Sequence, residues 1–123
     1  MIILGIDSTG DELLIGLSQD GQIIIKKGEA KPHSRSLFPL IRRLLKKKRP
    51  DAIAVSVGPG SYTGTRIGVV TANTLGWAWM VPVYGVAKRK ARTLSALVKE
   101  GQRRYTQGDR SSIATPLYKP LDE

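Results

Sequence analysis

Apolar and polar residues follow distinct patterns along the chain, and each pattern predicts a secondary-structure element. An unbroken apolar run, Ile2 to Ile6, predicts a buried strand that ends in the polar turn of residues 7–10. Two β-prone segments, 13–18 and 22–27, are separated by three residues ending in Gly21, which tolerates the positive φ of a hairpin turn. We therefore expect the first three strands to form an antiparallel meander.

A helix is predicted over about 34–48. Its apolar residues recur every three or four positions on one face: Leu37, Leu40, Ile41, Leu44 and Leu45. Ser34 or Ser36 suits the N-cap, and Pro39 is tolerated because the first-turn amides of a helix have no acceptor inside it. The pattern predicts an amphipathic helix with basic residues mostly off its apolar face.

The rest of the chain alternates strands and helices. Residues 52–57 are apolar on both faces, as expected of a central parallel strand, and are followed by a helix over 65–80, a strand over 82–86 and a helix over 87–100. Residues 101–112 are polar and turn-rich, which predicts a linker. Residues 114–118 are predicted to form a short edge strand, because Pro116 cannot sit inside a sheet. The order βββαβαβα with a mixed sheet is that of a single ribonuclease-H-like lobe of the actin-like ATPase (ASKHA) fold, an α/β class. We expect this lobe over 1–100 and a basic linker with a short C-terminal segment over 101–123.

Composition narrows the classes of function. A chain of 123 residues fits one compact domain and leaves no room for a separate catalytic domain. It has no cysteine, which excludes disulfides, thiolate metal sites and cysteine nucleophiles. Its first residues lack the basic region of a signal peptide, and no apolar run approaches the ~20 residues of a membrane span. We therefore expect no membrane segment and a cytoplasmic location.

Twenty basic against ten acidic residues give a formal charge of +10, which favours a polyanionic partner such as RNA. The first basic cluster comprises Arg42, Arg43, Lys46, Lys47, Lys48 and Arg49. The second basic cluster comprises Lys88, Arg89, Lys90, Arg92, Lys99, Arg103, Arg104 and Arg110. A solvated surface and an RNA-facing surface both remain open at this point.

Asp7 follows the first strand, where this architecture commonly places a carboxylate for a metal ion. A two-metal nuclease needs three or four converging acids, and the next strand ends in Ser56-Val57-Gly58 without one. The alternative is that Asp7 accepts hydrogen bonds from the turn amides. His33 has no histidine companion at a metal-ligand spacing, so we predict no metal site.

The residues from 58 to 66 form a glycine-rich loop that opens a helix. The loop set is Gly58, Pro59, Gly60, Ser61, Thr63, Gly64 and Arg66. Amides at such a junction attract anions, yet five residues between Gly58 and Gly64, and no lysine, depart from a Walker A loop. We favour a conformational role for the glycines, with anion binding as the alternative. No base stands near these hydroxyls, so no catalytic residue is predicted.

The helix after the loop carries a stripe of small residues, because Gly68, Ala72 and Gly76 recur every four positions. Each glycine costs about 1 kcal/mol of helix propensity relative to alanine, and close approach of another backbone is the usual compensation. That backbone belongs either to a partner chain or to the chain's own sheet.

Four segments together resemble the TsaB (YeaZ) family of tRNA threonylcarbamoyladenosine biosynthesis proteins. They are Ile2–Thr9, Pro32-His33-Ser34 with the helix it opens, Gly58–Gly68 and Pro116-Leu117-Tyr118. The resemblance implies a non-catalytic subunit that dimerises through its first two helices with the catalytic subunit TsaD, joined by the ATPase TsaE. That assembly transfers threonylcarbamoyl to adenosine 37 of tRNA. The metal and the adenylate sit in TsaD, so the resemblance implies no cofactor in this chain.

We accordingly predict a face that binds a TsaD-like subunit. Its residues are Leu37, Leu40, Ile41, Leu44, Leu45, Gly68, Val69, Ala72 and Gly76. The same face is compatible with a homodimer when the partner is absent, and the basic clusters with a tRNA contact. The chain departs from the family in having about two dozen linker-like residues in place of a second lobe.

Two alternatives from other classes accompany this prediction. One is a ribonuclease-H-like nuclease of the Holliday-junction-resolvase type, which would require Asp7 and a divalent metal. The other is a free-standing RNA-binding module that acts through its basic clusters.

Overall fold

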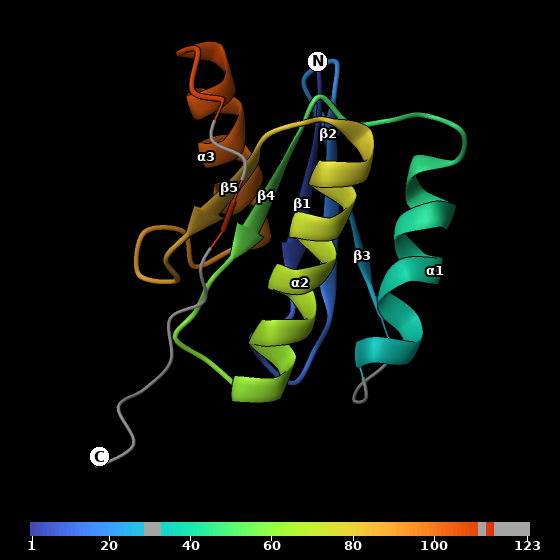
Figure 1. The fold of residues 1–123 in the computed structure, drawn as a ribbon, viewed down its shortest axis with the longest axis vertical. Helices are drawn as coiled ribbons and strands as arrows, with labels where there is room; N and C mark the ends of the chain where they lie inside the picture. The colour runs from blue at the N-terminus through green and yellow to red at the C-terminus, as the bar shows by residue number, and fades with distance from the viewer. Residues whose placement is uncertain (29–32, 111–112, 115–123) are drawn as a thin grey trace.

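The computed structural model describes residues 1–28, 33–110 and 113–114. A five-stranded sheet in the order β3-β2-β1-β4-β5 forms its centre (Figure 1). The strands are β1 (Ile2–Asp7), β2 (Leu14–Gln19), β3 (Gln22–Lys27), β4 (Ala52–Ser56) and β5 (Val83–Val86). Strand β1 pairs antiparallel with β2, and β2 with β3, which confirms the predicted meander. Strand β4 lies parallel between β1 and β5, as its apolar composition predicts.

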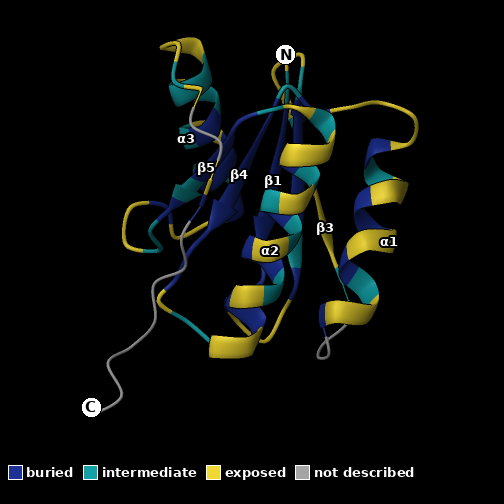
Figure 2. Cartoon of the chain, viewed as in Figure 1, coloured by how far each residue is buried: buried dark blue, intermediate teal, exposed yellow. Residues whose placement is uncertain are grey.

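Helices cover both faces of the sheet. Helices α1 (His33–Leu45) and α2 (Tyr62–Trp79) lie on one face, and α3 (Leu94–Thr106) lies on the other (Figure 1). The buried residues accordingly form two clusters, one under α1 and α2 and one under α3. Buried and exposed residues alternate along α1 and α2, so each helix buries one side and presents the other (Figure 2). The α/β class and the single ribonuclease-H-like lobe are confirmed.

The first two helices differ from their predicted bounds by about one turn. Helix α1 ends at Leu45 because Lys46 adopts a left-handed backbone, with φ of 57°. Helix α2 begins at Tyr62 because the Ser61 hydroxyl caps it, accepting a hydrogen bond of 3.1 Å from the Gly64 amide. Caps therefore set both ends more sharply than apolar spacing does.

Helix α3 begins and ends later than the apolar spacing predicts. Thr93 caps it by accepting a hydrogen bond of 3.1 Å from the Ala96 amide, and the chain before it makes turns. The helix continues to Thr106, so residues 101–106, predicted as linker, are helical. Gly101 is buried, and a Cβ there would lie 2.8 Å from the Cβ of Ala54. The glycine that suggested a break therefore allows the helix to approach the sheet.

Most of the predicted edge strand, residues 115–118, lies outside the described residues. Ala114 itself is fixed beside β5, where a Cβ on Gly85 would meet it at 3.0 Å. The Asn73 side chain donates a hydrogen bond of 3.0 Å to the Ala114 carbonyl and accepts one of 2.9 Å from the Ala114 amide. The C-terminal segment is thus attached to α2 at this point.

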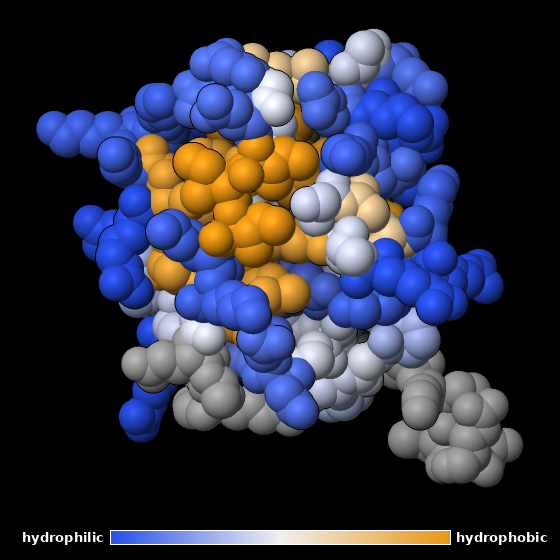
Figure 3. Space-filling model, turned by 180° about the vertical axis from the view of Figure 1, so that it is seen from behind, coloured by the Kyte–Doolittle hydropathy of each residue, from blue (hydrophilic) through white to orange (hydrophobic). Residues whose placement is uncertain are grey.

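The rear face of the sheet is only partly covered. Helix α3 packs on β1, β4, β2 and β5. An apolar patch remains visible from behind (Figure 3), and Ile25 of β3, paired opposite the α3-facing Gly16, is 45% exposed. None of the described helices is long and apolar enough to cross a membrane.

Candidate functional site

The turn after β1 lies at the carboxyl ends of the parallel strands. Asp7, Ser8 and Thr9 are all buried there. The Asp7 carboxylate accepts two hydrogen bonds from Thr9, 3.0 Å from its amide and 2.6 Å from its hydroxyl. This agrees with the interpretation of Asp7 as a turn residue that accepts hydrogen bonds from its neighbours.

Lys88, which the sequence analysis did not single out, completes this cluster. It follows β5, and its Nζ lies 2.6 Å from Asp7 Oδ2 and 3.0 Å from Thr9 Oγ1. Its backbone amide also donates to the carbonyl of Gly58, at 2.8 Å. Lys88 therefore links the turn after β1, the glycine loop and the segment after β5.

The ammonium group decides the ionisation of Asp7. Burial alone would raise the pKa of this carboxyl group, but the hydrogen bonds from Lys88 and Thr9 and the charge of Lys88 outweigh it. The pKa of Asp7 consequently lies below its ordinary value of 3.8, and the group is a carboxylate at neutral pH. Among the described residues, no three His, Cys, Asp or Glu side chains converge as metal ligands.

The glycine loop packs directly on the turn after β1. The Ser61 amide donates to the Thr9 carbonyl at 2.9 Å. A Cβ on Gly60 would lie 2.7 Å from that same oxygen, and one on Gly64 would lie 2.5 Å from the Ser8 carbonyl. These glycines are required for close packing, which supports the conformational interpretation of the loop.

The small-residue stripe of α2 faces the chain's own sheet. A Cβ on Gly68 would overlap the Ser8 hydroxyl, and one on Gly76 would overlap a methyl group of Val83. Val69 and Ala72 are 2% and 0% exposed. In this chain the surfaces of these four residues, which the sequence predicts to contact a partner, are buried against its own sheet.

The apolar face of α1 is buried in the same way. Leu37, Leu40, Ile41 and Leu45 belong to the core under the two helices, and Leu44 packs at its margin. Leu37, Leu40, Ile41 and Leu45 are at most 8% exposed, so they offer little surface to a partner, although Leu37 also lines the groove between α1 and α2. A partner that binds α1 and α2 must contact the opposite, outward sides of these helices.

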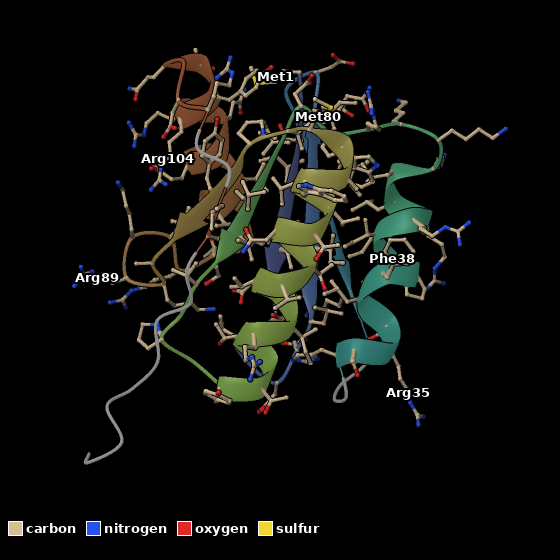
Figure 4. The ribbon with its side chains drawn as sticks, in the orientation of Figure 1. Met1, Arg35, Phe38, Met80, Arg89 and Arg104 are labelled. Carbon is tan, nitrogen blue, oxygen red and sulfur yellow. The ribbon has the colours of Figure 1, made fainter. Side chains whose placement is uncertain are left out.

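The outward sides of α1 and α2 form an open apolar groove. Its volume is about 390 Å³, and its lining residues are Ser34, Leu37, Phe38, Tyr62, Thr63, Arg66, Ile67, Val70 and Thr71. Phe38, Tyr62 and Val70 are 48%, 57% and 56% exposed, which is high for such large apolar side chains. Phe38 lies on the side of α1 nearest α2 (Figure 4).

Sequence reasoning missed this groove because its apolar residues are few. Tyr62, Arg66 and Val70 recur at four-residue intervals on one side of α2, and Trp77, 83% exposed, lies two turns further on. Arg66 donates a hydrogen bond of 3.2 Å to the Tyr62 hydroxyl, which orders this side of the helix. The signal was available as a second, weaker apolar stripe.

Comparison with known proteins identifies the family. Residues 24–115 match the family model described as TsaD: tRNA N6-adenosine threonylcarbamoyltransferase. The tRNA threonylcarbamoyladenosine biosynthesis protein TsaB of Bacillus subtilis is 36% identical, over 71% of this chain and 41% of its own. The chain belongs to the TsaD/TsaB (YeaZ) family. YeaZ from Pseudomonas aeruginosa superposes with a TM-score of 0.65 at 28% identity, over 71% of this chain and 43% of that one.

Two further facts qualify the TsaB/YeaZ likeness. The chain spans about a third to a half of the length of the curated relatives it matches, at 32%, 41% and 50%. A Holliday-junction complex of Thermus thermophilus RuvC superposes with a TM-score of 0.55 at 16% identity, over 98% of this chain and 84% of that one. At that identity the likeness concerns the fold, which TsaB/YeaZ proteins and RuvC share.

Proposed function

We propose that this chain is a non-catalytic subunit for tRNA N6-threonylcarbamoyladenosine (t6A37) modification, and that it binds a TsaD-like catalytic subunit through the outward groove of α1 and α2. A TsaE-like ATPase joins the assembly, and the chain pairs with itself when the TsaD-like subunit is absent. The family membership supports the pathway, since the relatives are named for this modification.

The observation that carries the proposal is the exposure of Phe38, Tyr62 and Val70 around one groove. Aromatic side chains that border an apolar groove on the surface are typical anchors of protein–protein interfaces. The groove also lies between the first two helices, which the family resemblance implicates in dimerisation with TsaD. An apolar helix face of the partner fits there.

The proposed lack of catalysis is supported by the environment of Asp7. In this architecture a carboxylate after the first strand is the usual candidate for binding a metal ion. Here the Lys88 ammonium lies 2.6 Å from Asp7 Oδ2 and occupies the side a cation would approach. The arrangement favours a structural role for Asp7 over the nuclease alternative.

The test replaces Val70 with glutamate and measures co-purification with the TsaD-like subunit of the same organism. Val70 is 56% exposed, so Val70→Glu leaves the fold intact. In the complex the carboxylate would lose its water, and the Arg66 guanidinium one turn earlier on the same side of α2 would offset only part of that cost, so we expect binding to fall at least about tenfold.

Ile25→Glu is the matched control, because Ile25 is an apolar residue of similar exposure, 45%, on the far side of the sheet. We expect it to leave co-purification unchanged. The interface assignment fails if Val70→Glu binds as the wild type does, or if Ile25→Glu alone abolishes binding. Loss of t6A in cells that carry Val70→Glu, measured by nucleoside analysis of bulk tRNA, would link the groove to the modification.

A further inference from the structure

The two basic clusters of the sequence differ in how their charges are used. In the second basic cluster five of the eight cations are engaged within the chain: Lys88, Lys90, Arg103, Arg104 and Arg110. The Glu100 carboxylate alone forms ion pairs with Arg103, Arg104 and Lys90. The hydrogen bonds in these pairs lower its pKa to about 2. Five of the eight side chains are therefore held in internal contacts, although the Asp7 and Glu100 carboxylates balance only two of the eight charges.

The first basic cluster, by contrast, has no counter-ion among the described residues. Across residues 1–28 and 33–110, no acidic side chain forms an ion pair with any of its six cations. Within the described part of the chain, Lys48 donates a side-chain hydrogen bond of 3.1 Å to Gln19. The negative end of the α1 dipole offsets part of the mutual repulsion of these cations within the last turn. A bound polyanion would relieve the remainder.

The backbone gathers these cations around an aromatic ring. Lys46 ends α1 in a left-handed conformation, and the Lys48 amide donates to the Leu45 carbonyl at 3.0 Å, so the chain folds over the end of the helix. A depression of about 270 Å³ results, lined by Phe38, Ile41, Arg42, Leu45, Lys46, Lys47, Lys48, Arg49 and Trp79. Trp79 is half-buried and anchored against the core.

We infer that the first basic cluster and Trp79 form a contact surface for RNA, in which the cations bind phosphates and the indole ring stacks on an unpaired base. An aromatic ring beside unpaired cations is the arrangement that binds single-stranded nucleic acid without reading its sequence. The tRNA that the proposed function implies supplies such bases in its loops. The inference rests on the proposed function for the identity of the RNA but is tested on the isolated chain.

The surface lies away from the second basic cluster. Met80, 91% exposed, lies at the end of the molecule where α1 and α2 finish, whereas Arg89 projects from the side of the molecule, on the segment between β5 and α3 (Figure 4). Exposed Arg89, Arg92 and Lys99 are the members of the second cluster that have neither an ion pair nor a side-chain hydrogen bond among the described residues. They provide a matched set of cations for comparison.

Binding of an unmodified tRNA transcript, measured by fluorescence anisotropy over a range of salt concentrations, tests the inference. The variant Lys46→Gln/Lys47→Gln/Arg49→Gln removes three cations of the first basic cluster. We expect its affinity near 0.1 M salt to fall about tenfold or more, and its log–log salt slope to decrease by about 2 to 3, because each lost phosphate contact contributes about 0.7 to 0.9. The control Arg89→Gln/Arg92→Gln/Lys99→Gln lowers the formal charge of +10 by the same three units, and we expect less than about a threefold loss.

Tryptophan fluorescence gives a second readout, since the chain has two tryptophans, Trp77 and Trp79. In Trp77→Phe the emission comes from Trp79, and stacking on a base should quench it when the tRNA binds. In Trp79→Phe the emission comes from Trp77, and we expect little quenching.

Three outcomes would overturn the inference. Equal losses in the two triple variants would mean that the tRNA responds to net charge alone. Quenching of Trp77 and not of Trp79 would remove the stacking assignment. If the Lys46/Lys47/Arg49 variant lost the TsaD-like subunit but kept the tRNA, the surface would be a protein contact. Loss of co-purification in Val70→Glu with tRNA affinity retained separates the proposed function from this surface.

Discussion

Replacing Gly68 with leucine is expected to destabilise the domain strongly. A Cβ at this position would overlap the Ser8 hydroxyl and lie 3.5 Å from a methyl group of Ile6. Ser8 cannot yield, because it is fully buried and its hydroxyl donates a hydrogen bond of 2.5 Å to the Gly64 carbonyl. Overpacking costs about 1–3 kcal/mol, and a broken buried hydrogen bond about as much again. The sum of about 2–6 kcal/mol is a large part of the stability of a small domain, about 5–15 kcal/mol, and reaches the lower end of that range.

Urea denaturation followed by circular dichroism measures the effect. Thr74→Leu is the matched control, because Thr74 is an exposed residue of the same helix and receives the same side chain. We expect Thr74→Leu to change the free energy of unfolding by less than about 0.5 kcal/mol. Gly68→Ala should be intermediate, since about 1 kcal/mol gained in helix propensity offsets part of the overlap. A folded Gly68→Leu of wild-type stability would mean that the stripe faces outward after all.

The stripe shows where the sequence stops being informative. A four-residue repeat predicts that Gly68, Ala72 and Gly76 share one side of a helix and that something packs closely on it. The repeat does not specify whether that neighbour is another chain or the chain's own sheet. The buried turn at Ser8, in a distant part of the sequence, and the side chain of Val83, at the start of the strand that follows α2, supply the answer.

The strands and the first two helices were predictable because the signals that specify them are local in the sequence. Apolar alternation, a glycine turn and a run of leucines are local signals, and each is read within about ten residues. The start of α3 was predicted too early because apolar spacing alone ignores the cap at Thr93. Its end was predicted too early because Gly101, a breaker by composition, is used for close packing.

Lys88 was missed because its partner Asp7 is 81 positions away and no motif joins them. A topological argument would have found it. Strands β1 and β4 are parallel, as are β4 and β5, so residues that follow them meet at one edge of the sheet. A lysine just after β5 is therefore a natural partner for a carboxylate just after β1.

Replacing Lys88 with methionine should be among the most destabilising single changes to a side chain that is partly exposed. Methionine keeps most of the aliphatic length but leaves the Asp7 carboxylate, 4% exposed, without its counter-ion. Breaking a fully buried pair costs about 3–5 kcal/mol. The Lys88 side chain is 35% exposed, and solvent screens part of the interaction, so we expect a loss of about 2–3 kcal/mol at neutral pH.

The dependence on pH separates this loss from a packing defect. In the wild type the pKa of Asp7 is lowered below 3.8, so the carboxylate contributes stability above about pH 4 that is lost as the pH falls through its folded pKa. In Lys88→Met the raising effect of burial on the pKa of Asp7 is opposed only by the two hydrogen bonds from Thr9, so this pKa lies higher than in the wild type. The stability gap between the two proteins should therefore be largest near neutral pH and should narrow as the pH falls toward about 4.

A second substitution tests whether the unpaired charge is the cause. In the double variant Asp7→Asn/Lys88→Met no buried charge remains, and the amide can still accept the Thr9 hydrogen bonds seen at 3.0 and 2.6 Å. We expect the double variant to be more stable than Lys88→Met alone, by about 1–2 kcal/mol. If the loss of stability in the double variant equals the sum of the losses in Asp7→Asn and in Lys88→Met, Lys88 acts through its aliphatic packing. The ion pair then does not hold the turn after β1 against β5.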